Sequence, residues 1–171
     1  MLLIKAVSKA LVPSYYTVSV ACPRLFSYTY LLLAEIDQYM DFWNLIVYNY
    51  TGPWSNISSD LANLFLSSDL LASMPFDTES IIYYYTLQGI VASKITLGIP
   101  LYSRYFHSTA SLDHPLGHPF SGTSTYDFKD LSSGGTSVVY DSLTASSYSY
   151  DTASGELVSY DIVEVVRQKA V

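Results

Sequence analysis

The stretch DFWNLIVYNYTGPW, from Asp41 to Trp54, decides the fold class of this 171-residue chain. It begins with a run of aromatic and β-branched residues, which is typical of a strand buried on both faces. Gly52 and Pro53 then end the strand. Strands of this kind occur in parallel sheets that helices cover, so the stretch predicts an α/β fold.

Shorter segments of a similar kind lie on both sides of this strand. We expect buried strands at residues 17–22 and 95–101, and helices at residues 3–11, 28–40 and 78–88. Gly89 follows the last of these helices and is expected to end it. Strands that alternate with helices in this order predict a parallel sheet.

The composition of the chain changes after Leu101. Residues 102–160 are rich in Ser, Gly, Tyr and Thr, and polar and apolar residues alternate in short runs. This pattern predicts a small antiparallel subdomain inserted after the third strand. Asp161, with Glu164 three residues later, is expected to cap a final helix. The predicted domain boundaries are therefore residues 1–101, 102–160 and 161–171.

Charge and composition exclude several classes of protein. The chain has 15 acidic and 8 basic side chains, a net charge of -7, and no cluster of Lys or Arg, so we expect no nucleic acid as a partner. No apolar run approaches the roughly 20 residues that span a bilayer, so we expect no membrane association. No signal peptide is recognisable, and the compartment stays unknown. Cys22 is the one cysteine, which excludes an intramolecular disulfide.

The usual motifs for cofactors and metals are absent from the sequence. It contains no Walker loop, no Rossmann glycine fingerprint, no nucleophile elbow and no His-Glu-x-x-His helix, so we predict no cofactor. His107, His114 and His118 fall in one loop, but no carboxylate or cysteine stands at a matching spacing, which favours a solvated loop over a metal site. Asp37 and Asp41 lie one helical turn apart, and we expect solvated carboxylates there rather than an acid/base pair.

The ends of the second and third predicted strands hold the candidate site residues. Tyr48 and Asn49 follow the strand that begins at Phe42, and Trp54 lies in the next loop. Tyr102 and Arg104 follow the third strand. Tyrosines, an amide, an arginine and a tryptophan on neighbouring strand ends could form a sugar-binding groove, and packed aromatics with a surface arginine explain the pattern about equally well.

Several segments resemble the family 18 glycoside hydrolases, the chitinases, of fungi. Residues 41–54 are similar to their sixth barrel strand, whose usual form is close to D-F-W-N-L-M-x-Y-D-Y-x-G-x-W. Residues 93–104, with the sequence SKITLGIPLYSR, resemble the seventh strand, S-K-I-x-L-G-x-P-L-Y-G-R. Residues 18–23 resemble the fifth strand. The stretch YDFKDL at 126–131 resembles part of the family's insertion domain.

This resemblance implies a barrel fold, and it implies that part of this barrel is missing from the sequence. The family fold is a (β/α)8 barrel, which needs about 250 residues before any insertion. The resemblance therefore implies a partial TIM barrel, strands five to seven of eight, formed by residues 1–101. An inserted α+β chitinase insertion domain follows at 102–160, and a returning barrel helix at 161–171. The missing barrel half is expected on a full-length chain.

The resemblance also implies a reaction whose central residues are absent here. Family members hydrolyse the β-1,4-N-acetylglucosamine links of chitin by a retaining mechanism in which the substrate's own N-acetyl group is the nucleophile. The last Glu of a D-x-x-D-x-D-W-E motif is the general acid. That motif occurs nowhere in these 171 residues, and none of the four glutamates stands at a matching position. We therefore predict no catalytic residue and no activity.

The candidate site residues match groove positions of the family. Tyr48 corresponds to the tyrosine that steadies the N-acetyl oxygen, and Trp54 aligns with a sugar-stacking tryptophan. Tyr102 and Arg104 align with groove residues. Asn49 stands where the family has Asp, so a hydrogen-bonding group is kept and a charge is lost. The implied partner is chitin or chito-oligosaccharides.

Other positions depart from the family pattern. Ser103 replaces a glycine, and Asp60 with Leu61 stands where His-Gln is common in fungal members. Asn49 and Asn56 each begin a glycosylation sequon, which has meaning if the chain is secreted.

Three functions compete on this basis. The chain is an enzyme, a chitinase by descent; or a lectin-like module that binds chitin or N-acetylglucosamine without hydrolysis; or a truncated or degenerate product of a chitinase gene. The missing general acid favours the third, because losing such an acid alone typically slows a reaction by about 10²–10⁴-fold.

Overall fold

The structure is a computed structural model that describes residues 2–22, 31–69, 74–107, 109, 115–131 and 137–170. The chain forms two compact units. Unit 1 consists of Met1–Val47 and Ser80–Gly98, and unit 2 consists of Tyr48–Glu79 and Ile99–Val171. The two units are described separately below.

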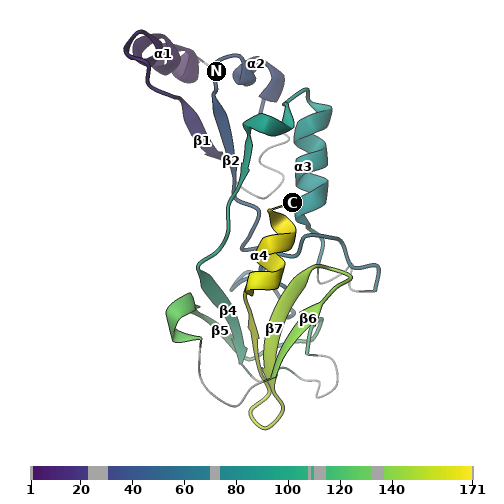
Figure 1. Ribbon diagram of the computed structural model, residues 1–171. Helices are drawn as coiled ribbons and strands as arrows, with labels where there is room; N and C mark the ends of the chain where they lie inside the picture. Colours follow the sequence, from purple (N-terminus) through teal and green to yellow (C-terminus); the bar gives the residue numbers. More distant parts are fainter. Residues whose placement is uncertain are drawn as a thin grey trace. The chain divides into compact units, whose positions relative to one another are not determined.

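Unit 1 contains a parallel sheet of three short strands. They are β1 (Ser19–Cys22), β2 (Phe42–Leu45) and β3 (Ile95–Leu97), in the order β1-β2-β3 (Figure 1). Ser19 pairs with Phe42, and Trp43 pairs with Ile95. The parallel arrangement confirms the prediction, although each strand is shorter than predicted. The strand expected to reach Tyr50 ends at Leu45, yet Trp43, Leu45 and Val47 are all buried, so the alternation of faces continues beyond the ladder.

One helix of unit 1 precedes the strands along the chain and two lie between them. They are α1 (Leu2–Leu11), α2 (Leu33–Asp37) and α3 (Thr78–Leu87), with short 3-10 turns at Val12–Ser14 and Ala92–Lys94. The first part of the helix expected at 28–40 lies outside the described residues, and α2 ends at Asp37. Helix α3 ends at Leu87 and Gly89 has a φ of 90°, which confirms the predicted stop, because glycine adopts this left-handed conformation without strain.

Asp37 and Asp41 support the packing of unit 1. Asp37 accepts a hydrogen bond from Nε1 of Trp43 at 2.8 Å and forms an ion pair with Lys94 at 3.0 Å. Asp41 accepts a hydrogen bond from the backbone N–H of Val18 at 2.7 Å. The expectation of a solvated carboxylate holds for Asp41, which is exposed, whereas Asp37 is partly buried and engaged by Trp43 and Lys94. Each carboxylate satisfies a donor that the sheet and helices leave open, which is a structural role.

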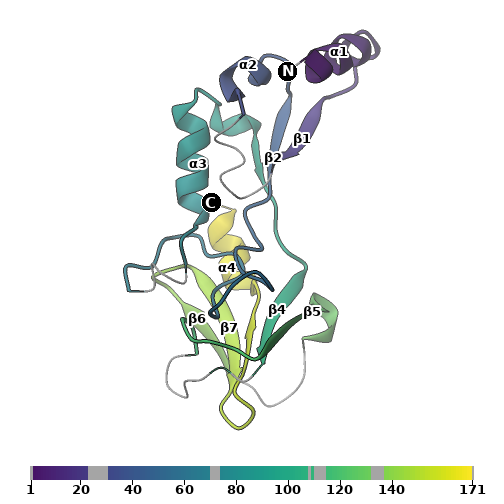
Figure 2. The same ribbon diagram turned by 180° about the vertical axis from the view of Figure 1, so that it is seen from behind.

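Unit 2 contains an antiparallel sheet of five strands. They are β4 (Tyr102–His107), β5 (Gly122–Asp127), β6 (Ser137–Asp141), β7 (Ser146–Asp151) and β8 (Glu156–Ser159), in the order β5-β4-β8-β7-β6 (Figure 2). A 3-10 turn follows β5 at Phe128–Asp130. The alternation of polar and apolar residues after Leu101 predicted antiparallel strands, and the pairing of these strands confirms the prediction.

A hydrophobic core lies against this sheet. Met74, Phe106, Leu116 and Leu157 are buried together, and Phe120, Tyr148 and Tyr150 pack around them. The rings of Phe106 and Phe120 meet edge to face, with centroids 4.9 Å apart. The core draws residues from two strands and from two loops, so it ties the loop 48–79 of unit 2 to its sheet.

The final helix, α4 (Val163–Lys169), begins differently from the prediction. Its N-cap is Ile162, with no side-chain cap, so the expectation that Asp161 caps this helix is wrong. Asp161 instead accepts a hydrogen bond from Nζ of Lys169 at 2.6 Å, and both side chains are almost fully buried. Burial raises the pKa of Asp161 and lowers that of Lys169, because it disfavours both charged forms. Pairing Asp161 with the buried ammonium of Lys169 stabilises the fold more than a cap on helix α4 would.

Candidate carbohydrate-binding site

Unit 2 holds all five residues that the sequence analysis singled out as a candidate groove, and it links them in two groups. Tyr48 and Tyr102 meet edge to face, with ring centroids 6.2 Å apart and planes at 79°. Asn49, Trp54 and Arg104 form the second group, in which Arg104 contacts both of the others. Residues up to 55 positions apart in sequence are thus brought together.

Asn49 has an unusual backbone conformation. Its φ of 62° lies in the left-handed region, which asparagine enters more readily than most residues with a side chain. In this conformation its Oδ1 accepts a hydrogen bond from Nη2 of Arg104 at 2.6 Å. The turn that follows the buried strand segment therefore aims the amide at the guanidinium.

Arg104 is buried in the middle of the sheet of unit 2. It lies on β4, opposite Thr125 of β5 and Ser159 of β8, and is only 7% exposed. Burial lowers the pKa of Arg104, although a guanidinium keeps its charge in proteins. Its Nε has no hydrogen-bond partner among the described residues, and no carboxylate there lies within ion-pair distance of it.

Trp54 offers an accessible ring beside this charge. The ring is 56% exposed, and its centroid lies 5.7 Å from the guanidinium carbon of Arg104, within the range of a cation–π contact. The ring also lies against the backbone of Gly52, where a Cβ atom would come within 2.5–2.8 Å of it. Oγ of Ser55 accepts a hydrogen bond from the N–H of Gly52 at 3.2 Å and holds the turn.

Ser103, which replaces a glycine of the family pattern, does not face the groove residues. Neighbouring side chains of a strand point to opposite faces, so Ser103 lies across the sheet from Tyr102 and Arg104. It is fully buried, and its hydroxyl donates to the carbonyl oxygen of Tyr126 at 3.4 Å. This departure leaves the groove face of β4 unchanged.

The structure also reveals a buried charge cluster that the sequence analysis did not identify. Asp60 is fully buried, accepts a hydrogen bond from Oγ of Ser146 at 2.7 Å, and lies near the pair formed by Asp161 and Lys169. Burial raises the pKa of Asp60 to about 7. Its other oxygen, Oδ1, has no partner among the described residues. One feature of the sequence pointed to this cluster. Asp60 and Leu61 stand where His-Gln is common in fungal members of the family.

The histidines do not assemble a metal site in the part of the chain that the structure describes. His107 lies edge to face with Tyr105, and its Nδ1 is 3.7 Å from Glu156. Of the other two histidines, His118 lies within the described residues and His114 lies outside them. Among described residues, no three His, Cys, Asp or Glu side chains are grouped as metal ligands would be. Within the same ranges, no helix has the length and apolar character needed to cross a bilayer.

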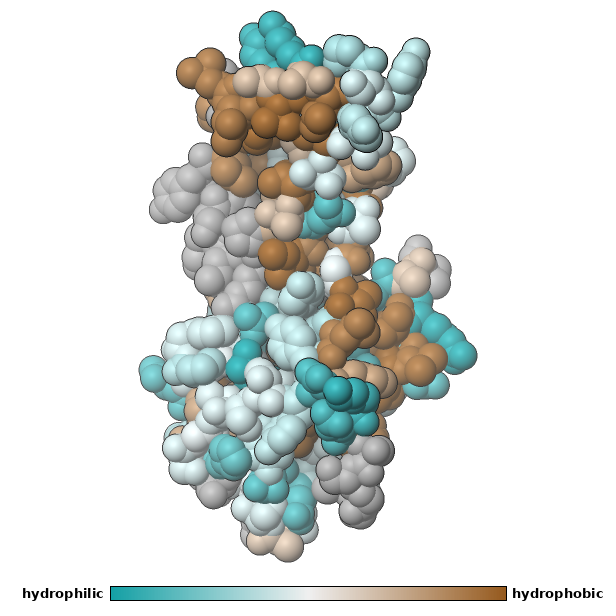
Figure 3. Space-filling view, turned by 90° about the vertical axis from the view of Figure 1, so that its left-hand side faces the viewer, coloured by the Kyte–Doolittle hydropathy of each residue, from teal (hydrophilic) through white to brown (hydrophobic). Residues whose placement is uncertain are grey.

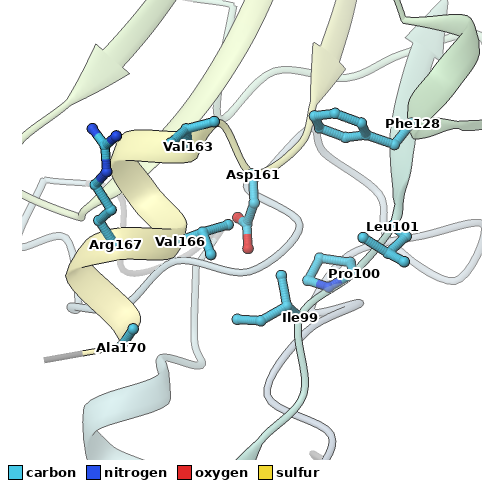
Figure 4. A pocket seen from close by; sticks show the side chains of 9 residues that line it. All are labelled: Ile99, Pro100, Leu101, Phe128, Asp161, Val163, Val166, Arg167 and Ala170. Atoms are coloured by element: carbon cyan, nitrogen blue, oxygen red, sulfur yellow. The ribbon is translucent and has the colours of Figure 1, made fainter.

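A pocket of about 260 Å³ lies elsewhere in unit 2 (Figure 4). Helix α4 forms one wall with Val163 and Val166, and the segment that leads into β4 forms another with Ile99 and Leu101. The one carboxylate on its wall, Asp161, is already paired with Lys169. The pocket contains none of the five groove residues, and its remaining lining is mostly apolar.

Comparison with known proteins assigns the chain to a family, and the fold described above agrees with that assignment. Parallel strands alternating with helices, followed by an antiparallel sheet, define an α/β protein in which Arg104 of β4 contacts Asn49 and Trp54, which lie outside the sheet. The chain belongs to the glycosyl hydrolases family 18, whose family model matches residues 1–171.

Curated relatives and solved structures agree with this assignment. Over 163 residues the chain is 34% identical to Endochitinase 1 of the fungus Metarhizium robertsii, which covers 91% of this chain and 38% of that protein. It also resembles Chitinase ChiA74 from Bacillus thuringiensis, with a TM-score of 0.88 and 24% identity over 98% of this chain and 32% of the other. A family 18 N-acetylglucosaminidase from Paenibacillus barengoltzii matches with a TM-score of 0.87, at 21% identity and over 52% of its own length. The chain thus spans well under two thirds of these proteins, and the structural matches show the shared fold.

Proposed function

We propose that this chain supplies strands five to seven of a family 18 barrel together with the family's α+β insertion domain. Residues 1–101 and 161–171 would belong to the barrel and residues 102–160 to the insertion. The parallel order β1-β2-β3 and the antiparallel sheet that follows support this assignment. In an eight-stranded barrel, the free edges of β1 and β3 would each have a neighbour.

We further propose that these 171 residues do not hydrolyse chitin by themselves. The reaction of the family needs a general acid beside the glycosidic oxygen, and the D-x-x-D-x-D-W-E motif that holds it is not in this sequence. Asp60 has the raised pKa that suits a general acid, but it is fully buried and out of reach of a polymer. The absence of the motif is the observation on which this proposal rests.

A second function, the binding of chito-oligosaccharides without hydrolysis, is favoured by the groove itself. An accessible tryptophan ring beside a guanidinium and an amide offers the stacking surface and the donors that a pyranose needs. Tyr48 and Tyr102 add two more rings with hydroxyl tips. This arrangement needs no general acid and would operate in a protein that has lost its catalytic motif.

Turnover of fluorogenic chitobioside and chitotrioside tests the first of these functions. We expect no release of fluorophore above that of buffer, with a full-length family 18 chitinase as positive control. Activity that boiling abolishes would contradict the proposal.

Retention on chitin beads tests the second function. Trp54→Ala should reduce retention about ten-fold, because the contact of a sugar with one aromatic ring is worth on the order of 1–2 kcal/mol. Tyr83→Ala removes another exposed aromatic side chain, outside the groove residues, and should have no effect. Equal retention of wild type and Trp54→Ala would argue against the groove.

A further inference from the structure

The two glycosylation sequons of the sequence lie in one loop of unit 2 but in different surroundings. The first begins at Asn49 and ends at Thr51, and the second begins at Asn56 and ends at Ser58. Residue type alone favours the first, because a sequon that ends in threonine is in general a better acceptor than one that ends in serine. The surroundings of the two asparagines favour the second.

The side chain of Asn56 is open to solvent. Asn56 is exposed and lies at a bend of the loop, and among the described residues no hydrogen bond engages its side chain. An oligosaccharide joined to its amide nitrogen would extend into water, where bulky glycans are accommodated. It would replace no contact of the folded chain.

The backbone on both sides of Asn56 is held in place. Before it, the N–H of Ser55 donates to the carbonyl oxygen of Gly52 at 2.9 Å and closes a turn. After it, Ser58 is fully buried and its hydroxyl donates to the carbonyl oxygen of Pro115 at 2.6 Å. The exposed amide therefore lies between two fixed points, and a glycan on it would leave both of them intact.

The surroundings of Asn49 oppose a glycan. Its Oδ1 accepts the hydrogen bond from Nη2 of Arg104 at 2.6 Å. A sugar joined to Nδ2 would lie on the same side of the amide as Oδ1, because a substituted amide is planar and trans. It would therefore crowd the guanidinium, which is only 7% exposed, and Thr51 at the end of this sequon is 1% exposed.

We propose that Asn56 is an N-glycosylation site of this protein and that the folded chain carries no glycan at Asn49. The donor is an oligosaccharide on a polyprenyl pyrophosphate, used by the transferase of a secretory pathway. The amide nitrogen of Asn56 attacks C1 of the first sugar, and an N–C1 bond forms. The bond from C1 to the pyrophosphate oxygen breaks, the lipid pyrophosphate leaves with that electron pair, and the amide proton passes to a base of the transferase.

The fold acts on this reaction by deciding which glycosylated chain can fold. The transferase uses extended acceptor segments, so transfer to Asn56 precedes the burial of Ser58. A chain glycosylated at Asn49 would lose a buried hydrogen bond to a charged group, which should lower its folded fraction about ten-fold or more. Chains that fail to fold are removed by chaperones and proteases, so the surviving protein should carry the glycan at Asn56.

Expression of the full 171-residue chain in yeast, behind a cleavable secretion leader, provides the test. An N-glycosidase in heavy-oxygen water converts each glycosylated asparagine into a labelled aspartate, and peptide mass spectrometry then gives the occupancy of each sequon. We expect the label at Asn56, with at least about ten-fold less at Asn49. Protease-resistant protein from the medium and from the cells is analysed in the same way, so the result does not depend on the secreted yield.

Two matched variants assign the glycan by gel mobility before and after the glycosidase. Asn56→Asp removes the acceptor amide at an exposed position and should abolish the mobility shift. Asn49→Asp makes the same chemical change in the other sequon and should leave the shift as in the wild type. The occupancy of Asn56 in the wild type decides the matter even if Asn49→Asp does not fold.

Each other result counts against the proposal. Comparable label at both asparagines of the folded protein would show that the contact with Arg104 does not exclude a glycan. Label at Asn49 alone would show that the threonine of the first sequon outweighs the fold. An unmodified Asn56 in the total product would overturn the site itself. None of these results bears on the binding of sugars proposed above.

Discussion

The two sheets of this protein differ in how fully their strands are paired. Among the described residues of unit 1, only β2 has a neighbour on each side, and β1 and β3 are edges. In unit 2 the three inner strands β4, β8 and β7 are paired on both sides, and the strands are four to six residues long. Backbone groups at an edge depend on water or on a further chain for their hydrogen bonds.

The difference extends to the side chains. Unit 2 closes its own core around Phe106 and Leu157. In unit 1, helix α1 leaves Leu2 and Leu3 more than three quarters exposed, and Figure 3 shows apolar surface gathered at this end of the chain. In unit 2 loop residues such as Met74 and Leu116 cover one face of the antiparallel sheet, whereas a parallel sheet needs both of its faces covered. The groove residues lie in the unit that is complete.

The largest expected effect concerns the ion pair in unit 2. Lys169→Met removes the ammonium that faces Asp161 and leaves a buried carboxylate without its partner, which should lower the free energy of unfolding by about 3–5 kcal/mol. Urea unfolding followed by hydrogen exchange in β7 and β8 measures it. Lys129→Met, which breaks an exposed pair with Asp127, should change stability by less than about 1 kcal/mol. Equal effects would show that the buried pair contributes no more than a surface one.

A second effect of comparable size is a pH dependence of unit 2. Burial raises the pKa of Asp60 from its ordinary value of 3.8 to about 7, so the folded state binds this proton more tightly than the unfolded state. The contribution is complete below pH 3.8 and is lost as the pH rises to 7, a change of about 4 kcal/mol at roughly 1.36 kcal/mol per pKa unit. Asp141, Asp161 and Lys169 are the charged groups around Asp60.

The variant Asp60→Asn tests this pH dependence. It should flatten the stability between about pH 4 and pH 7, because an amide does not titrate in this range. Urea midpoints across that range provide the measurement, and Asp130→Asn, at an exposed position, is the matched control. A wild type whose unit 2 gains stability as the pH rises would contradict the assignment.

Hydrogen exchange compares the two units directly. Amides of β1 and β3 should exchange about 100-fold faster than those of β4 and β8, because edge strands with a partly exposed helix layer open at low free energy. Mass spectrometry of exchanged peptides resolves the two sheets. Similar protection in both would show that unit 1 is as well covered as unit 2.

The smallest effect concerns the turn under Trp54. Gly52→Ala places a Cβ within 2.8 Å of the ring, so the Trp54 ring must shift from its present place, and binding to chitin should fall several-fold with a stability change of about 1 kcal/mol. Gly122→Ala is the control, since its Cβ would meet His107 at an ordinary 3.5 Å. Unchanged binding by Gly52→Ala would show that binding does not depend on the position of the Trp54 ring.

Local sequence patterns predicted much of the secondary structure, but they did not predict the contacts of the buried charged side chains. The run from Phe42 to Val47 predicted a strand buried on both faces, and the strand is confirmed, but only the face with Trp43, Leu45 and Val47 is buried, whereas Phe42 is exposed. Asp161 was expected to cap α4 because only its neighbours in sequence were considered. Its true partner, Lys169, lies at the far end of that helix, and Asp60 approaches them from another loop. No local pattern contains such contacts.

The sequence by itself determined the family, the alternation of strands and helices, the antiparallel segment after Leu101 and the five candidate residues of the groove. These features depend on the order and spacing of residue types along the chain. Only the tertiary structure decided that Arg104 is buried against the amide of Asn49, with no carboxylate of the described residues in an ion pair with it. The charge of a groove is set by which side chains meet across 55 positions of sequence, and by how much water folding removes from them.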